Sequence, residues 1–139
     1  MNRKAIYITA FDLKRLRNEI ESYRTYGNEA YWKYAEQLQR ELESAIVLES
    51  KDLPEDVISM NARVRLEDLE TGQTMEYTLV FPSISDAREK KISVLAPVGT
   101  AMLGARVGDI IEWPVPKGIR RLAVREILYQ PEAAGHFHL

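Results

Sequence analysis

Two glycines near the middle of the chain have the spacing of a phosphate-binding loop. Four residues separate Gly99 from Gly104, as in the motif G-x-x-x-x-G-K-[ST], whose backbone amides cradle phosphate groups. The motif also needs a lysine that reaches the phosphates and a hydroxyl that holds magnesium. Ala105 and Arg106 stand at those two positions here. We therefore interpret both glycines as structural residues that start and end a short helix, and we expect no cofactor.

Two histidines are the next residues whose types suggest chemistry. His136 and His138 alternate along the chain, and imidazole nitrogens are common zinc ligands. Two ligands alone make an incomplete zinc site, because structural and catalytic sites use three or four protein ligands. We predict a solvated tail over residues 130–139 and no metal site.

Two basic doublets, Lys90-Lys91 and Arg120-Arg121, raise the question of nucleic-acid binding. No aromatic residues interleave with them, as they do in proteins that bind single strands. The formal net charge of -2 also gives no overall field that would attract nucleic acid or an anionic membrane. We expect the doublets to serve solubility.

The composition indicates one modest globular unit. The chain has 139 residues, 45% of them apolar, which is enough for one domain or for a domain with a small appendage. There is no cysteine, so a disulfide framework and thiol chemistry are excluded. No apolar run has the length of a membrane span, and the first residues do not read as a signal peptide. We expect a soluble cytoplasmic protein.

The first third of the chain predicts an antiparallel helical hairpin. Apolar residues recur there at alternating spacings of three and four, which is the pattern of a helix seam. The first seam contains Leu13, Leu16, Ile20 and Tyr23, and the second contains Tyr31, Ala35, Leu38, Leu42 and Ala45. Thr9 and Asp12 form a capping box at the start, and Gly27 interrupts the pattern between the seams. The remaining faces are strongly charged, so we expect the hairpin to project into solvent.

After a charged linker at 49–56, the period changes from helical to strand-like. A helix that starts at Pro97 and ends at Gly104 interrupts the strands. The predicted strands are 57–66, 74–81, 92–96, 110–113 and 119–129. The fold class is therefore α+β: a hairpin domain at 1–52 and, at 53–139, an antiparallel β domain of five or six strands with one short helix.

The segment from Ser93 to Asp109 carries a resemblance to a known family. It is similar to the signature S-P-x-x-x-x-L-x-G-x-x-x-G-D of the Gre-type transcription elongation factors. Five ordered blocks, at 57–65, 78–82, 95–104, 106–109 and 129–135, resemble a subfamily with a shorter hairpin. The resemblance implies a short antiparallel coiled coil followed by an FKBP-like domain. It also implies a non-enzymatic, monomeric regulator that binds bacterial RNA polymerase near the secondary channel and competes with Gre factors.

The hairpin tip departs from the family pattern. Gre factors carry closely spaced acids at the tip that help to hold a catalytic magnesium ion, which prefers carboxylate ligands. Here Asn28 and Glu29 mark the tip, Glu21 lies about two turns lower, and Arg24 lies between. The first helix, over about fifteen residues, is only ~22 Å long. We therefore expect no transcript-cleavage activity and contact with nucleic acid at most indirectly, through the polymerase.

Two alternatives stay open at this stage. One is a transcript-cleavage cofactor of the Gre type. The other is an FKBP-like prolyl isomerase, which would need a deep pocket lined by aromatic side chains. The candidates for such a pocket are Tyr77, Phe81, Trp113 and Tyr129.

The exposed positions around the short helix are our candidates for polymerase binding. They are Pro97, Val98, Gly99, Thr100, Arg106 and Asp109. Pro97 and Gly99 would allow close approach of a partner, and Arg106 could contact a partner carboxylate with both arms of its guanidinium. Asp109 has a competing role, because an Asp after Gly108 commonly fixes a turn. Arg106 also has an alternative role, because its side chain could simply face solvent as a spacer in the turn.

Overall fold

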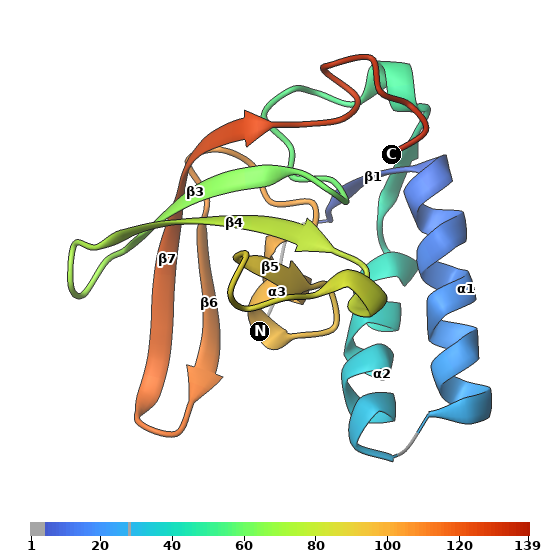
Figure 1. Cartoon of the computed structure of the whole chain (residues 1–139), viewed down its shortest axis with the longest axis horizontal. Helices are drawn as coiled ribbons and strands as arrows, with labels where there is room; N and C mark the ends of the chain where they lie inside the picture. Colours follow the sequence, from blue (N-terminus) through green and yellow to red (C-terminus); the bar gives the residue numbers. More distant parts are fainter. Residues whose placement is uncertain (1–4, 28) are drawn as a thin grey trace.

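The computed structural model describes residues 5–27 and 29–139, and its N-terminal part is a helical hairpin (Figure 1). Helix α1 (Ala10–Tyr26) begins at Thr9, whose hydroxyl oxygen accepts a 3.0 Å hydrogen bond from the amide of Asp12. Helix α2 (Glu29–Glu43) runs back beside it. The hairpin and its N-cap are confirmed. The capping box is only half formed, because the Asp12 carboxylate bonds elsewhere.

A small parallel sheet closes the base of the hairpin. Strand β1 (Tyr7–Thr9) leads into α1, and β2 (Ile46–Leu48) follows α2. The two strands pair in parallel, with Tyr7 opposite Ile46. The strands predicted above do not include β2.

The second part is a curled five-stranded sheet in the order β5-β4-β3-β7-β6 (Figure 1). Its strands are β3 (Arg63–Asp68), β4 (Thr74–Val80), β5 (Lys91–Ser93), β6 (Ile110–Val115) and β7 (Gly118–Tyr129). The pairings are antiparallel, as predicted, except that β5 runs parallel to β4. Register shifts between β3 and β7 mark the bulges that help a long strand to bend.

Two of the predicted strands are shorter than expected. The segment 57–62 is not a strand, because Val57 forms only an isolated bridge with Arg106 and Asn61 has a left-handed φ of 67°. Residues 57–60 are all buried, so the alternation of side-chain types along this segment does not mark one buried and one exposed face of a strand. The strand predicted at 92–96 ends at Ser93, whose hydroxyl accepts a hydrogen bond from the amide of Leu95 and turns the chain.

Two short 3₁₀ turns and one helix complete the fold. The turns are η1 (Ser50–Asp52) and η2 (Pro82–Ile84). Helix α3 (Pro97–Met102) starts at the predicted proline. Gly104 follows it with φ +76°, and a Cβ atom at this position would lie 2.3 Å from Ile6. The glycine is therefore needed both for the left-handed turn and for close packing against the N-terminal segment.

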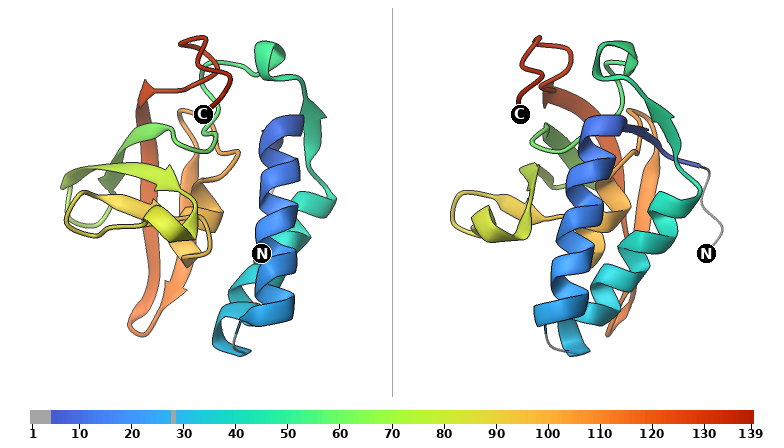
Figure 2. Two further views of the ribbon diagram at one scale, coloured as in Figure 1. Left: turned by 45° about the vertical axis from the view of Figure 1, so that its right-hand side comes forward. Right: turned by 90° about the vertical axis from the view of Figure 1, so that its right-hand side faces the viewer.

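One apolar cluster joins the hairpin to the sheet. Leu16 and Leu38 from the hairpin are fully buried in the same cluster as Ile58, Leu66 and Met102. Figures 1 and 2 show the hairpin lying alongside the β part. The expectation that the hairpin projects into solvent is therefore wrong. The narrow seams are sufficient for both contacts, because the seam residues of both helices belong to the same buried cluster as Ile58, Met60 and Met102.

Candidate functional site

The segment from β5 through α3 to β6 is held rigidly on the sheet. The Thr100 hydroxyl donates a 2.6 Å hydrogen bond to the carbonyl of Val94. Gly99 packs so closely on the end of β5 that a Cβ atom there would lie 2.0 Å from the carbonyl oxygen of Ser93. These contacts fix how α3 presents its outer surface.

Arg106 is tied to the segment that precedes β3. Its Nε and Nη2 atoms donate hydrogen bonds of 3.2 and 3.1 Å to the two carboxylate oxygens of Asp56. Its guanidinium also lies 5.4 Å from the ring centre of Tyr7. The hydrogen bond and the charge of Asp56 raise the pKa of Arg106 above its already high ordinary value. The bidentate contact that we expected with a partner is thus made within the chain.

The six docking candidates divide by burial. Pro97 and Asp109 are exposed, and Val98 and Arg106 are partly buried. Gly99 and Thr100 are buried, so the expectation that they form part of an exposed surface is wrong. Asp109 accepts a 2.9 Å hydrogen bond from the amide of Arg106, which is the turn-forming role considered above. The candidates that a partner can reach in this structure are Pro97, Val98, Arg106 and Asp109.

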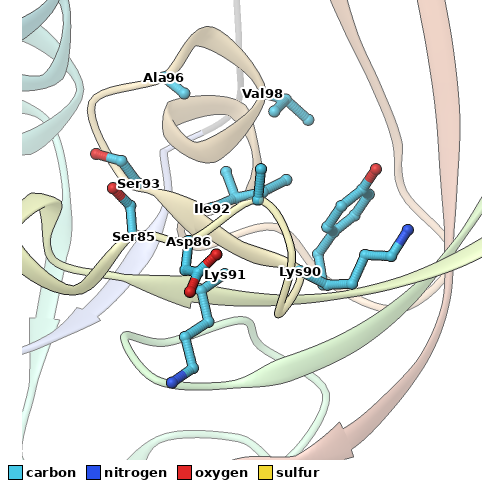
Figure 3. Close-up of a pocket in the computed structure, with 10 residues that line it drawn as sticks. Ser85, Asp86, Lys90, Lys91, Ile92, Ser93, Ala96 and Val98 are labelled. Atoms are coloured by element: carbon cyan, nitrogen blue, oxygen red, sulfur yellow. The ribbon is translucent and has the colours of Figure 1, made fainter.

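An open groove runs beside α3 (Figure 3). Its volume is about 470 Å³, and its lining includes Tyr77, Ile92, Ala96 and Val98. Lys90, Lys91 and Asp86 contribute to its rim, and Lys90 Nζ lies 6.0 Å from the centre of the Tyr77 ring. Such a groove suits an apolar side chain with polar groups around it. The sequence did not reveal it, because its walls come from separate segments.

The aromatic candidates for a proline pocket lie in different places. Tyr77 lines the groove beside α3. The Phe81 ring packs against Arg15, with 4.8 Å between the guanidinium carbon and the ring centre. The Tyr129 hydroxyl lies 2.7 Å from Nδ1 of His136. The Trp113 side chain is outside the described part of the structure. The described rings therefore do not line one common pocket.

The hairpin tip is aromatic rather than acidic in the described residues. Asn28, one of our two tip residues, lies outside them, and Glu29 is exposed at the start of α2. The rings of Tyr23 and Tyr31 are 5.7 Å apart. Arg24 lies 5.0 Å from the Trp32 ring centre and 3.8 Å from the Glu21 carboxylate. No pair of free acids is therefore described near the tip.

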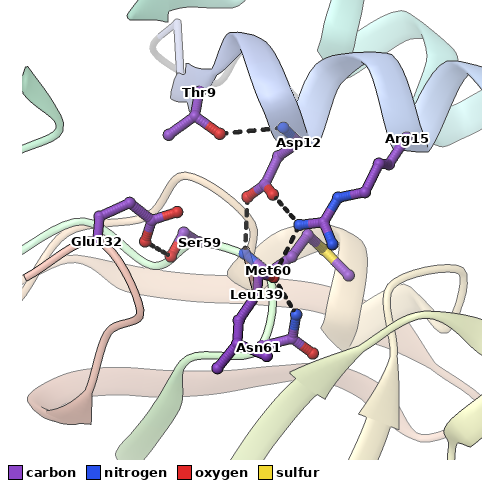
Figure 4. Close-up of polar contacts among 8 residues, drawn as sticks. All are labelled: Thr9, Asp12, Arg15, Ser59, Met60, Asn61, Glu132 and Leu139. Carbon is purple, nitrogen blue, oxygen red and sulfur yellow. Dashed lines mark hydrogen bonds and ion pairs between the residues drawn. The ribbon is translucent and has the colours of Figure 1, made fainter. Parts of the chain in front are cut away.

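A partly buried polar cluster at the base of the hairpin was missed by sequence reasoning (Figure 4). We call Asp12, Arg15, Met60, Asn61 and Leu139 the base cluster. Asp12 is 1% exposed and accepts hydrogen bonds from Arg15 and, at 3.1 Å, from the amide of Met60. Burial raises the pKa of Asp12, and the bonds from Arg15 and Met60 offset this in part. The backbone atoms in this cluster carry no signature in the sequence.

The predicted solvated tail over residues 130–139 is confirmed only in part, because residues 133–139 are exposed whereas Gln130 and Pro131 are buried. Gln130 is buried, and its side chain donates to the carbonyls of Pro54 and Val57 at 2.8 and 2.6 Å. Glu132 accepts a 2.6 Å hydrogen bond from Ser59. The rings of His136 and His138 are 6.2 Å apart. Within the described ranges, no three His, Cys, Asp or Glu side chains gather in a way that could hold a metal ion.

The basic doublets do not form a free patch. Arg120 pairs with the almost fully buried carboxylate of Asp68, and Arg121 pairs with Glu112 at 3.1 Å. Lys91 pairs with Glu89 at 2.9 Å.

Among residues 5–27 and 29–139, no helix combines the length and the apolar composition that crossing a bilayer requires.

Two family models match this chain in adjoining segments. The model described as "Transcription elongation factor, GreA/GreB, C-term" matches residues 53–129. The model described as "Rnk N-terminus" matches residues 4–48. The boundary between the two matches falls at the linker that separates the hairpin from the sheet.

Curated relatives and solved structures agree with these matches. The regulator of nucleoside diphosphate kinase of Escherichia coli (strain K12) is 39% identical over 140 residues, which is 100% of both chains. The GreA of Chloroherpeton thalassium is 42% identical over 65% of this chain and 57% of its own length. A solved GreA/GreB elongation factor from Nitrosomonas europaea is 35% identical, with a TM-score of 0.73 over 89% of this chain and 99% of that one.

The match over the full length of the Escherichia coli regulator contrasts with the match to the GreA of Chloroherpeton thalassium, of which this chain spans only 57%. The chain belongs to the Rnk family of Gre-related proteins, the family of the regulators of nucleoside diphosphate kinase.

Proposed function

We propose that this protein is a non-enzymatic transcription regulator that binds bacterial RNA polymerase near the secondary channel and competes there with Gre factors. The observation that carries the proposal is the match of residues 53–129 to the C-terminal part of GreA and GreB, which are elongation factors by name. Its docking surface consists of Pro97 and Val98 on α3, with Arg106 and Asp109 on the following turn. Gly99 and Thr100 support that surface from beneath.

The geometry around α3 supports this assignment. The helix is pinned through Thr100 and Gly99, so its exposed side is preorganised before a partner arrives. The adjacent groove adds an apolar floor with Lys90, Lys91 and Asp86 at its edge. A partner surface that carries an apolar side chain next to a carboxylate would fit both features.

The tip of the hairpin supports a role without transcript cleavage. A magnesium ion would need free carboxylates, whereas Glu21 lies near Arg24 and the tyrosines pack together. Prolyl isomerisation has less support, because the described aromatic side chains are spread over separate parts of the fold. Shared folds do not carry an activity with them.

The name of the Escherichia coli relative also links this family to nucleoside diphosphate kinase. We propose the same link for this protein, as a regulatory effect on the level of that enzyme rather than a kinase activity. The effect would then follow from altered transcription.

Binding to immobilised core RNA polymerase tests the docking surface, with all variants first checked for folding. Pro97→Asp should weaken binding about tenfold or more, since a charge would replace an exposed apolar residue at the centre of the contact. Ile119→Asp is the matched control, because Ile119 is 51% exposed on the sheet, away from α3. Equal binding by the Pro97 variant and the wild type would reject this surface.

A second pair of variants tests Arg106 together with Asp56, its ion-pair partner within the chain. Arg106→Ala should weaken binding, whereas Asp56→Ala, which frees the guanidinium from its internal carboxylate, should leave binding at least as strong. Equal losses in both variants would mean that the pair acts only by holding the turn. Docking would then have to be assigned to α3 alone.

A further inference from the structure

The groove beside α3 carries a lysine whose charge no described acid balances. Lys90 and Lys91 both contribute to its rim, and their side chains point in different directions (Figure 3). Lys91 pairs with Glu89 at 2.9 Å. Within residues 5–27 and 29–139, no carboxylate pairs with Lys90, whose ammonium instead lies 6.0 Å from the centre of the Tyr77 ring. The Tyr77 end of the groove therefore presents a cation beside an aromatic ring.

The acidic residue on the rim is associated with Lys91 rather than with Lys90. The amide and the carbonyl of Asp86 bond the carbonyl and the amide of Lys91 at 3.0 and 2.9 Å. Asp86 Oδ1 accepts a 2.9 Å hydrogen bond from the amide of Arg88. Asp86 and Lys91 lie together, and Lys90 points away from them (Figure 3). The opposite charges on the rim are therefore separated.

The backbone holds Lys90 in a conformation that lysine rarely adopts. Its φ is 59°, in the left-handed region that glycine and asparagine enter more readily. Its carbonyl accepts a 2.9 Å hydrogen bond from the amide of Thr78, which fixes the residue beside β4. A glycine would fit this turn without strain. A lysine at such a position points to a role for its side chain.

The apolar part of the groove continues the docking surface on α3. Tyr77 on β4, Ile92 on β5 and Val98 on α3 line it, and each of them is only partly buried. Val98 also belongs to the docking surface proposed above. Because the groove is open, a side chain of a partner bound at α3 can enter it.

We propose that the groove receives an apolar side chain of the polymerase, and that Lys90 selects a carboxylate next to that side chain. The inference rests on the proposed docking of α3 and deepens it, because it states the chemistry of the contacted segment. Tyr77, Ile92 and Val98 hold the apolar part, and the Lys90 ammonium pairs with the carboxylate at the rim. A charge pair at this edge adds specificity and faster association more than affinity.

Two substitutions at Lys90 separate binding from stability. Lys90→Gly removes the ammonium and accepts the φ of 59°, so it should be at least as stable in urea as the wild type. It should nevertheless bind core RNA polymerase about threefold more weakly. Lys90→Glu should weaken binding about tenfold or more, because the partner carboxylate would then face a like charge. Both losses should shrink at high salt, since Lys90 is exposed.

Arg88→Glu is the matched control. Arg88 is exposed on the same loop and undergoes the same change of charge as Lys90→Glu, but it does not line the groove. This variant should bind the polymerase as tightly as the wild type. Equal binding by Lys90→Glu and Arg88→Glu would overturn the proposal.

A small probe tests the groove without the polymerase. Phenylpropionate combines an apolar ring with a carboxylate, and phenylpropionamide is its neutral counterpart. In NMR titrations of the whole chain, the acid should shift the backbone amides of Ile92 and Val98 at lower concentrations than its neutral counterpart does. Lys90→Gly should abolish this preference. Equal responses to both probes, or no response at these amides, would overturn the proposal. A preserved preference in a protein that does not bind polymerase would reject the proposed function and not the selectivity of the groove.

Discussion

Gly99 lies against the carbonyl oxygen of Ser93 at a separation that leaves no room for a side chain, since a Cβ atom would come within 2.0 Å of that oxygen. The contact sets α3 directly on the end of β5. It explains why a glycine stands inside a helix of only six residues, where it would otherwise weaken the helix. The glycine spacing that resembles a phosphate-binding loop is therefore a packing requirement.

Replacing this glycine should disturb the docking surface and the fold together. Gly99→Ala should lower the free energy of unfolding by about 3 kcal/mol, because the obstacle is backbone that cannot rotate away. Gly72→Ala is the control, since φ is +75° there but no atom lies within 4 Å of the added carbon. It should cost only about 1 kcal/mol. Urea denaturation measures both, and equal losses would contradict the packing account.

Asp68 should contribute stability that depends on pH. The amide of Glu70, then that of Thr71 and the charge of Arg120, hold the pKa of this carboxyl below its ordinary value of 3.8. A carboxyl with a lowered pKa in the folded state stabilises the fold fully above 3.8, and this contribution is lost as the pH falls through the lower folded value. Asp68→Asn should therefore be less stable than wild type at pH 6, with a gap that narrows below pH ~4.

Thermal unfolding at a series of pH values tests this expectation. Asp52→Asn is a suitable control, because Asp52 is exposed on η1. It should follow the wild type at every pH. A gap between Asp68→Asn and wild type that stays constant, or widens, toward low pH would show that the interactions of Asp68 do not depend on its charge.

Backtracked polymerase complexes test the absence of transcript cleavage. Incubated with this protein and magnesium, they should release transcript fragments no faster than the intrinsic rate of the polymerase, because no free acid pair is described at the tip. A GreA protein provides the positive control. Acceleration that is lost in Glu29→Ala would contradict this prediction and restore the cleavage-cofactor alternative.

Features with a local cause were predictable from the sequence. Pro97 and Gly104 mark the ends of α3 because one lacks an amide hydrogen and the other accepts a positive φ. The buried Leu16 and Leu38 follow from seam spacing. The interpretation of the glycine spacing as structural rested on the missing lysine and hydroxyl, and the packing of Gly99 agrees with it.

Features that depend on distant backbone were not predictable. Asp12 looked like a capping residue, yet its carboxylate bonds the amide of Met60, forty-eight positions away. The contact between Arg15 and the C-terminal segment uses the main-chain oxygen of Leu139, which any residue type would supply. Burial of Gly99 and Thr100 likewise follows from the packing of α3 on the end of β5 rather than from their residue types.

Competition with a GreA protein for core RNA polymerase tests the central claim most directly. A fluorescently labelled GreA is bound to the polymerase, and this protein is titrated against it. The account predicts complete displacement that Pro97→Asp reduces by about tenfold or more in apparent affinity and Ile119→Asp leaves unchanged. Simultaneous binding of both proteins, or no binding of this one, would contradict it.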